Sequence, residues 1–204
     1  MVAKYVTTEE QDKRDKHIQR IRSAVSNLTD ILNEFLSLGR IEEGRIQANF
    51  SIFNMKEQIQ LICSEITPIL RQGQIVNYQH KGKLKAFLDL SLLRNVLINL
   101  VSNAIKFSPE NSHIEVLSEV NDKNILISVR DHGMGIPDDD KKHLFERFFR
   151  AKNVTNIQGT GLGLHIVSKY VELMNGRINV ESELEKGTKF NIQFPYAQDS
   201  IDRG

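Results

Sequence analysis

The spacing of apolar residues changes once along the chain, and this change strongly constrains the fold. Between residues 10 and 45 apolar residues recur at alternating intervals of three and four, at Ile18, Ile21, Val25, Leu28, Leu32 and Phe35. This is the narrow apolar stripe of one long, coiled-coil-like helix, uninterrupted by glycine or proline before Gly39. One helix cannot bury such a stripe alone, so it requires a second helix from the same subunit or from another.

After Gly44 the pattern becomes one of short strands and helices. Strands are expected over residues 47–53, 75–80, 87–89, 113–120, 123–130, 177–183 and 188–194. Helices are expected over residues 54–73, 91–107, 139–149 and 162–174. Hairpins adjoin one another while helices alternate with strands. We therefore predict an α+β fold, a two-layer α/β sandwich in which a mixed, mostly antiparallel sheet has helices on one face.

Composition excludes several classes of protein. The 204 residues are 40% hydrophobic and 26% charged, so a packed core is expected rather than disorder. A formal net charge of +1 gives no electrostatic reason to expect nucleic acid as a partner. The lone Cys63 excludes a disulfide framework, and its apolar neighbours predict a core thiol. The chain contains no apolar run long enough to span a bilayer and no signal peptide.

The helix expected over residues 91–107 carries two asparagines and a lysine on one face. Asn99 and Asn103 are four residues apart and Lys106 is three further on. The two amide oxygens on this helix face can coordinate Mg²⁺. This ion takes few protein ligands and shares its site with substrate phosphates. The ammonium group of Lys106 can meet phosphate oxygens. A solvated polar stripe is the alternative interpretation, and the neighbouring motifs decide against it.

A turn containing two glycines follows the strand expected over residues 123–130. Asp131 ends that strand, and Gly133 and Gly135 follow at intervals of two. A carboxylate accepts hydrogen bonds, so it can read an exocyclic amine such as that of adenine. Glycine lets the backbone pass close to a flat ring. The alternative is an ordinary turn that ends a strand.

A second glycine motif, Gly159 to Leu164, opens the helix expected over residues 162–174. Backbone N–H groups at a helix N-terminus can hold phosphate. A dinucleotide-binding loop does not fit, because the spacing is Gly-x-Gly-x-Gly and no buried strand precedes it. A Walker loop does not fit either, because its Gly-Lys-Ser/Thr ending is absent.

Aromatic and basic residues lie between the two glycine motifs. They are Phe145, Arg147, Phe148, Phe149 and Arg150, an apolar anchor beside two cations. Residues 151–158 are polar and aperiodic, and we expect them to form a mobile lid. All four motifs fall between residues 99 and 164, and together they predict one pocket for ATP and its metal.

These motifs closely resemble the catalytic, ATP-binding domain of sensor histidine kinases, in the Bergerat-fold ATPase superfamily. The resemblance covers residues 10–196 and includes a closing Gly187-Thr188-x-Phe190 hairpin. It implies ATP and Mg²⁺ as cofactors, with Asn103 and Asn99 holding the metal and Asp131 binding adenine. The catalytic set that it implies is Asn103, Lys106, Arg147 and Arg150. The implied cofactor-binding set is Asn99, Asn103, Lys106, Phe107, Asp131, Gly133, Gly135, Ile136, Phe148, Gly159, Thr160, Gly161, Leu162, Gly163, Leu164 and Thr188.

The N-terminal helix resembles the second helix of the family's dimerisation and phosphotransfer hairpin. Residues 1–45 would then be part of that hairpin, with residues 7–15 as its loop. Residues 46–197 would be the ATP-binding domain and residues 198–204 a C-terminal tail. The family's phosphoacceptor motif, His-acidic-x-Arg-Thr-Pro, is absent from the sequence. We interpret all six histidines as structural, namely His17, His80, His113, His132, His143 and His165. The chain is therefore expected to begin just past its own substrate histidine.

The resemblance implies a protein-histidine kinase of a two-component phosphorelay. The γ-phosphoryl group of ATP would pass to a histidine, and then to an aspartate in the receiver domain of a response regulator. We expect the chain alone to bind ATP with Mg²⁺ without autophosphorylating. The intact protein would be a homodimer through its helical hairpin. It would be cytoplasmic, reaching a membrane only through segments outside this chain.

Two other functions stay open. The first is a nucleotide-gated conformational switch like the gyrase-type ATPases of the superfamily. Those enzymes place a water-activating glutamate in the asparagine-bearing helix, whereas no Glu or Asp occurs from Ser91 to Ser108. The second is a non-catalytic scaffold that dimerises through the apolar stripe and binds no nucleotide. The presence of Asn103 and Asp131 argues against the scaffold.

Overall fold

The computed structural model describes residues 11–154, 157 and 159–196. The predicted tail over residues 198–204 and the beginning of the predicted hairpin loop lie outside the described residues. The chain divides into two compact units, Met1–Glu43 and Gly44–Gly204. None of the described helices is long and apolar enough to cross a membrane.

The first unit contains one long helix, α1 (Gln11–Glu42, 32 residues). The helix already includes residues 11–15, so the expected loop over residues 7–15 is wrong in its second half. The six stripe residues named above are between 40% and 68% exposed. An apolar face this exposed is what the three-four spacing predicts for a helix that packs against a partner.

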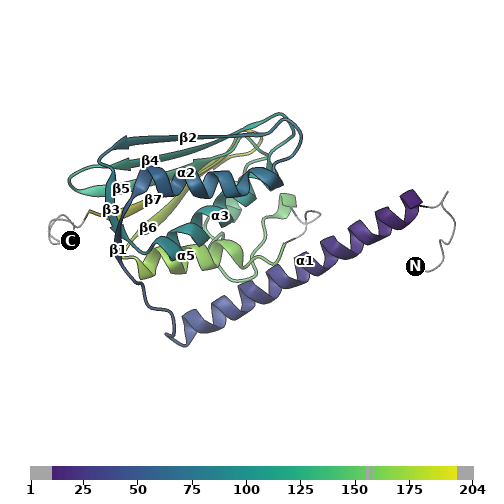
Figure 1. Ribbon diagram of the computed structural model, residues 1–204, viewed down its shortest axis with the longest axis horizontal. Coiled ribbons are helices and arrows are strands. Elements are labelled where there is room, and N and C mark those ends of the chain that lie inside the picture. The colour runs from purple at the N-terminus through teal and green to yellow at the C-terminus, as the bar shows by residue number, and fades with distance from the viewer. Residues whose placement is uncertain (1–10, 155–156, 158, 197–204) are drawn as a thin grey trace. The chain divides into compact units, whose positions relative to one another are not determined.

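The second unit has two layers, a five-stranded sheet and a layer of helices on one of its faces (Figure 1). The strands are β2 (Ile75–Gly82), β4 (His113–Val120), β5 (Asn124–Arg130), β6 (Arg177–Glu183) and β7 (Gly187–Pro195), in the order β2-β4-β5-β7-β6. The β2–β4 pair is parallel and the other pairs are antiparallel. The helices are α2 (Met55–Ile66), α3 (Leu90–Phe107) and α5 (Gly163–Leu173). The predicted α+β sandwich is thereby confirmed.

Side chains at two helix starts fix where α2 and α3 begin. Asn54 ends β1 (Ser51–Asn54), and its Oδ1 accepts the N–H of Glu57 at 3.3 Å, the contact expected of an asparagine three residues before a glutamate at a helix start. β1 pairs with β3 (Lys85–Leu88) in a separate two-stranded sheet. Asp89 follows β3, is buried, and accepts the N–H of Leu92 at 2.9 Å and that of Asn49 at 2.7 Å. This cap fixes the residue at which α3 begins.

The core lies between α3 and the sheet. The buried residues of α3 follow one helical face, namely Leu92, Leu93, Val96, Leu97, Leu100, Val101, Ala104 and Ile105. Alternate residues of β5 (Ile125, Ile127 and Val129) are buried with them. Cys63 is also buried, as predicted, and burial raises the pKa of its thiol to about 11. Because α3 buries this apolar face, its asparagines and Lys106 lie on the remaining surface.

The helix predicted over residues 139–149 is much shorter in the structure. Only α4 (Asp138–Lys141) is helical, and the chain continues in turns bonded three residues back, such as Glu146 N–H to His143 O at 2.9 Å. Phe148 has φ +59°, a left-handed conformation that no α-helix can contain. Two further 3₁₀ turns, η3 (Thr67–Ile69) and η4 (Lys152–Val154), occur where a longer helix and an irregular segment were expected.

Candidate nucleotide-binding site

A pocket lies where α3, the residues after β5, and the start of α5 meet, and all four motifs contribute to its lining. The predicted residues that line it are Asn103, Lys106, Phe107, Asp131, Gly135, Ile136, Arg150, Gly159, Gly161, Gly163, Leu164 and Thr188. These residues come from positions up to 85 apart in the sequence. The fold therefore brings the predicted motifs together in one place.

Asp131 is a buried carboxylate held by backbone donors. Its Oδ1 accepts the N–H of Gly133 at 2.8 Å and that of Thr188 at 3.2 Å. Burial raises its pKa above 3.8, while these hydrogen bonds and nearby His132 act in the opposite direction without cancelling the effect. No described residue bonds to Oδ2. One carboxylate oxygen thus anchors the side chain, and the other remains an acceptor in a residue that lines the pocket.

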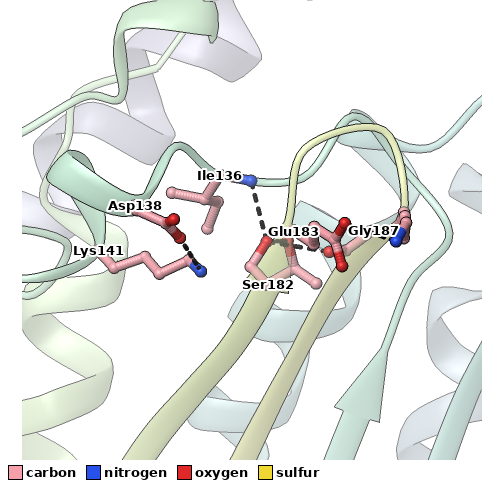
Figure 2. Close-up of polar contacts among 8 residues, drawn as sticks. Ile136, Asp138, Lys141, Ser182, Glu183 and Gly187 are labelled. Atoms are coloured by element: carbon pink, nitrogen blue, oxygen red, sulfur yellow. Dashed lines mark hydrogen bonds and ion pairs between the residues drawn. The ribbon is translucent and has the colours of Figure 1, made fainter.

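The turn after Asp131 packs tightly against the hairpin formed by β6 and β7. Ser182 Oγ accepts the N–H of Ile136 at 2.9 Å and donates to the carbonyl of Gly187 at 2.9 Å (Figure 2). A Cβ on Gly135, where φ is +66°, would lie 2.0 Å from the carbonyl oxygen of Glu183. Sequence reasoning gave this glycine a role beside a flat ring. The structure adds a second reason, because the hairpin backbone leaves no room for a side chain.

The polar face of α3 meets the start of α5. Asn103 Nδ2 donates to Asn99 Oδ1 at 3.1 Å, so Asn99 holds the amide of Asn103 although Asn99 does not line the pocket. A Cβ on Gly163 would lie 2.8 Å from the amide atoms of Asn99. Lys106 Nζ lies 5.2 Å from the ring centroid of Phe107, within cation–π range. The ammonium group and the first turn of α5 thus contribute to the same pocket.

The second glycine motif shapes the loop that leads into α5. Leu162 is buried, and its N–H donates to Thr160 Oγ1 at 3.1 Å. Gly161 has φ +76°, and a Cβ there would lie 2.7 Å from the backbone carbon of Phe148. α5 starts at Gly163 without a side-chain cap. Its first N–H groups therefore depend on water or a ligand for partners.

The aromatic and basic segment divides between the pocket and the surface. Phe149 and Arg150 line the pocket, whereas Arg147 and Phe148 are exposed and lie outside its lining. Arg150 Nη2 donates to the carbonyl oxygen of Val154 at 2.8 Å and also to that of Ile157. This cation thus holds part of the segment predicted as a lid, of which residues 155, 156 and 158 lie outside the described residues.

Some predicted residues do not line the pocket, and some lining residues were not predicted. The first group is Asn99, Gly133, Arg147, Phe148, Thr160 and Leu162. The second group is Met134, Leu144, Phe149, Ala151, Asn153, Val154, Ile157 and Phe190. Phe149 and Phe190 stand inside recognisable motifs and could have been included. The others are mostly apolar residues of irregular segments, which have no periodicity that marks them.

Comparisons with known proteins identify the family of the chain. The family described as histidine kinase-, DNA gyrase B-, and HSP90-like ATPase matches residues 88–198, more than half of the chain. The autoinducer 2 sensor kinase/phosphatase LuxQ of Vibrio cholerae is 30% identical over 192 residues, which cover 90% of this chain and 22% of LuxQ. The signal transduction histidine-protein kinase ArlS of Staphylococcus haemolyticus is 31% identical over 173 residues, covering 83% of this chain and 38% of ArlS. The chain therefore spans less than two fifths of these relatives.

Solved structures share the fold. The catalytic domain of histidine kinase ThkA matches with a TM-score of 0.63 at 30% identity, covering 72% of this chain and 98% of that one. The Acinetobacter baumannii histidine kinase AdeS matches with a TM-score of 0.73 at 21% identity, covering 89% of this chain and 84% of AdeS, which supports the fold alone. The chain belongs to the histidine kinase-, DNA gyrase B-, and HSP90-like ATPase family, and within it to the catalytic, ATP-binding domains of sensor histidine kinases.

Proposed function

We propose that the pocket binds ATP together with Mg²⁺ and that the chain transfers the γ-phosphoryl group to a histidine. The observation that carries this proposal is the convergence of Asn103, Asp131 and the start of α5 on one pocket. An acceptor for an amine, an amide ligand for a hard cation and a row of N–H donors are the groups that a purine nucleotide requires. The division into a partial hairpin over residues 1–45 and an ATP-binding domain over residues 46–197 belongs to the same proposal.

The base would bind at Asp131. Its Oδ1 is occupied by two backbone N–H groups, so Oδ2 is the oxygen left to accept the exocyclic amine of adenine. Apolar residues such as Met134 and Phe190 line the same pocket and exclude water from the base. A hydrogen bond to a charged acceptor is stronger in such a place than in water.

The phosphates would lie toward α3 and α5. Asn103 has its Nδ2 bonded to Asn99, which leaves its amide oxygen for a hard cation, and Mg²⁺ prefers oxygen ligands. When bound, Mg²⁺ would neutralise charge on the phosphates of ATP. Lys106 and the first N–H groups of α5 would hold phosphate oxygens. Arg150 also lines the pocket and would contact the phosphates while its guanidinium holds the carbonyl groups of Val154 and Ile157. The predicted roles of Arg147 and Phe148 require the exposed part of that segment to contact a partner.

Relay to a response regulator completes the proposal. None of the six histidines stands in the family's phosphoacceptor motif, so the acceptor would be a histidine outside these 204 residues. Full-length ShkA has been solved with AMPPNP, and ThkA with the response regulator protein TrrA. These complexes support a nucleotide ligand and a receiver-domain partner for this chain. The exposed stripe of α1 supports a homodimer through the hairpin. A cytoplasmic location stays part of the proposal.

Calorimetric titration with AMPPNP in the presence of Mg²⁺ tests the binding step. We expect one nucleotide per chain and weaker binding after chelation of the metal. No binding with Mg²⁺ present would instead support the non-catalytic scaffold. Incubation with γ-labelled ATP tests the acceptor, because phosphohistidine is labile in acid and stable in base. Label with these properties on the chain alone would contradict the proposed external acceptor.

A further inference from the structure

One peptide group in the pocket wall is held at both ends by side chains from different elements. The carbonyl oxygen of Gly135 accepts Asn153 Nδ2 at 2.9 Å. The N–H of Ile136, at the other end of the same peptide, donates to Ser182 Oγ at 2.9 Å (Figure 2). A trans peptide directs its C=O and N–H to opposite sides. The Gly135–Ile136 peptide therefore lies between the β6–β7 hairpin and η4.

On the hairpin side, the contact continues to the residues proposed to bind the base. Ser182 Oγ lies 2.9 Å from Thr188 Oγ1 and donates to the carbonyl of Gly187. The N–H of Thr188 in turn bonds to Asp131. Movement of Ser182 would therefore displace Thr188, and through it Asp131, and both of these residues line the pocket.

On the opposite side, η4 is also anchored. The N–H of Lys152 donates to the buried carboxylate of Asp140 at 2.8 Å, and Arg150 holds the carbonyl of Val154. Asn153 itself lines the pocket and is the side chain that joins η4 to the turn after Asp131. The two walls of the pocket are therefore connected through one peptide.

We propose that the Gly135–Ile136 peptide couples these two walls, and that Ser182 and Asn153 are positioning residues for the nucleotide. This inference rests on the proposed function and deepens it. Gly135 is buried with φ +66° and has no side chain to restrict rotation of the peptide that follows it. The two hydrogen bonds are then what fixes the peptide plane. Loss of either bond frees the plane, so loss of the second adds little.

A double-mutant cycle with Ser182→Ala and Asn153→Ala tests the coupling. Binding of ADP in the presence of Mg²⁺ is measured by calorimetry for the unaltered chain, both single variants and the double variant. Each single variant should weaken binding about two- to tenfold, the range for one lost hydrogen bond. The double variant should bind within about twofold of the weaker single variant, rather than at the product of the two factors. Ser182→Thr keeps the hydroxyl group and should restore binding.

A matched control is Asn191→Ala, which removes an exposed bond from Asn191 Nδ2 to Glu181 Oε1 (2.8 Å) within the same hairpin. It should leave the affinity for ADP unchanged. The coupling is refuted if the two factors multiply, if Ser182→Ala behaves like the control, or if Asn153→Ala alone has no effect. Where Ser182→Ala disturbs folding, Asn153→Ala at an exposed position still tests the positioning role, and no loss of ADP affinity in this variant refutes the proposal. Failure of the unaltered chain to bind ADP would instead refute the proposed function.

Discussion

Replacing Asp131 by asparagine should separate nucleotide binding from stability. The carboxylate is buried, and burial raises its pKa, so in the folded chain without ligand its charge is unfavourable. Asparagine keeps one oxygen, which can still accept the N–H groups of Gly133 and Thr188. It replaces Oδ2 by an NH₂ group, which cannot accept from the amine of adenine.

The magnitude follows from the bonds involved. A hydrogen bond to a charged acceptor contributes about 1.5–3 kcal/mol, so we expect the affinity for ADP to fall at least about tenfold, toward a hundredfold. In Asp131→Asn the hydrogen bonds from Gly133 and Thr188 become weaker, which lowers stability. The removal of a buried charge raises stability and offsets this loss. The change in the free energy of unfolding should stay within about 1 kcal/mol, or a few degrees in Tm for a chain of this size.

The assay combines calorimetric titration of ADP with thermal unfolding of the chain without nucleotide. Asp89→Asn is the matched control, because Asp89 is also buried and accepts two backbone N–H groups, one on each oxygen. Its variant should bind ADP normally and lose about 1–3 kcal/mol of stability, since one N–H would face an NH₂ group. If Asp131→Asn binds ADP as well as the unaltered chain, or loses as much stability as the control, the reasoning is wrong.

Three more predictions follow from the same geometry. Ionised Asp131 is the form that binds an amine, so ADP affinity should fall as pH is lowered through the raised pKa. Ionisation of Asp131 also costs stability without ligand, so as pH rises from about 3.8 through that pKa the unaltered chain should lose stability relative to Asp131→Asn. Calorimetry and thermal melts of both chains from about pH 4 to 7 check the two trends. Gly163→Ala should displace Asn99, whose amide lies 2.8 Å from the new Cβ. AMPPNP binding in the presence of Mg²⁺ should weaken about two- to tenfold with Tm nearly unchanged, and an affinity equal to that of the unaltered chain would contradict this. Cys63 is buried, and burial raises the pKa of its thiol to about 11. The thiol should therefore react with dithionitrobenzoate at pH 8 far more slowly in the folded chain than in urea, and equal rates would refute the burial of Cys63.

Local patterns in the sequence predicted most of the fold. The spacing of Asn54 and Glu57 and the alternating apolar residues of β5 are signals in neighbouring residues, and the structure shows the helix cap and the strand that they favour. The parallel pairing of β2 with β4 was not predicted, because β3 and α3 separate these strands in the sequence and no local pattern marks which distant strands pair. The one-turn length of α4 and the left-handed conformation of Phe148 were also missed. Phe148 lies close to Gly161, and local patterns do not mark a contact between residues this far apart in the sequence.

The pocket shows the same division between local and non-local information. Asn103 and Asp131 carry a chemical signal in their own motifs, and both line the pocket. Asn153 carries none, because a polar residue in an aperiodic segment looks the same whether or not it bonds to the backbone of Gly135. The binding and catalytic roles of the predicted residues stay predictions until they are measured.

The order of strands also bears on how the chain avoids unwanted aggregation. β2 and β6 are the edges of the five-stranded sheet, where unpaired backbone groups could recruit a strand from another molecule. The exposed side chains of both edges are largely polar or charged, among them Gln79 and Lys81 on β2 and Arg177, Glu181 and Glu183 on β6. Such residues discourage the dehydrated stacking of strands that leads to fibrils. Addition of a strand from a second copy at either edge is therefore unfavourable.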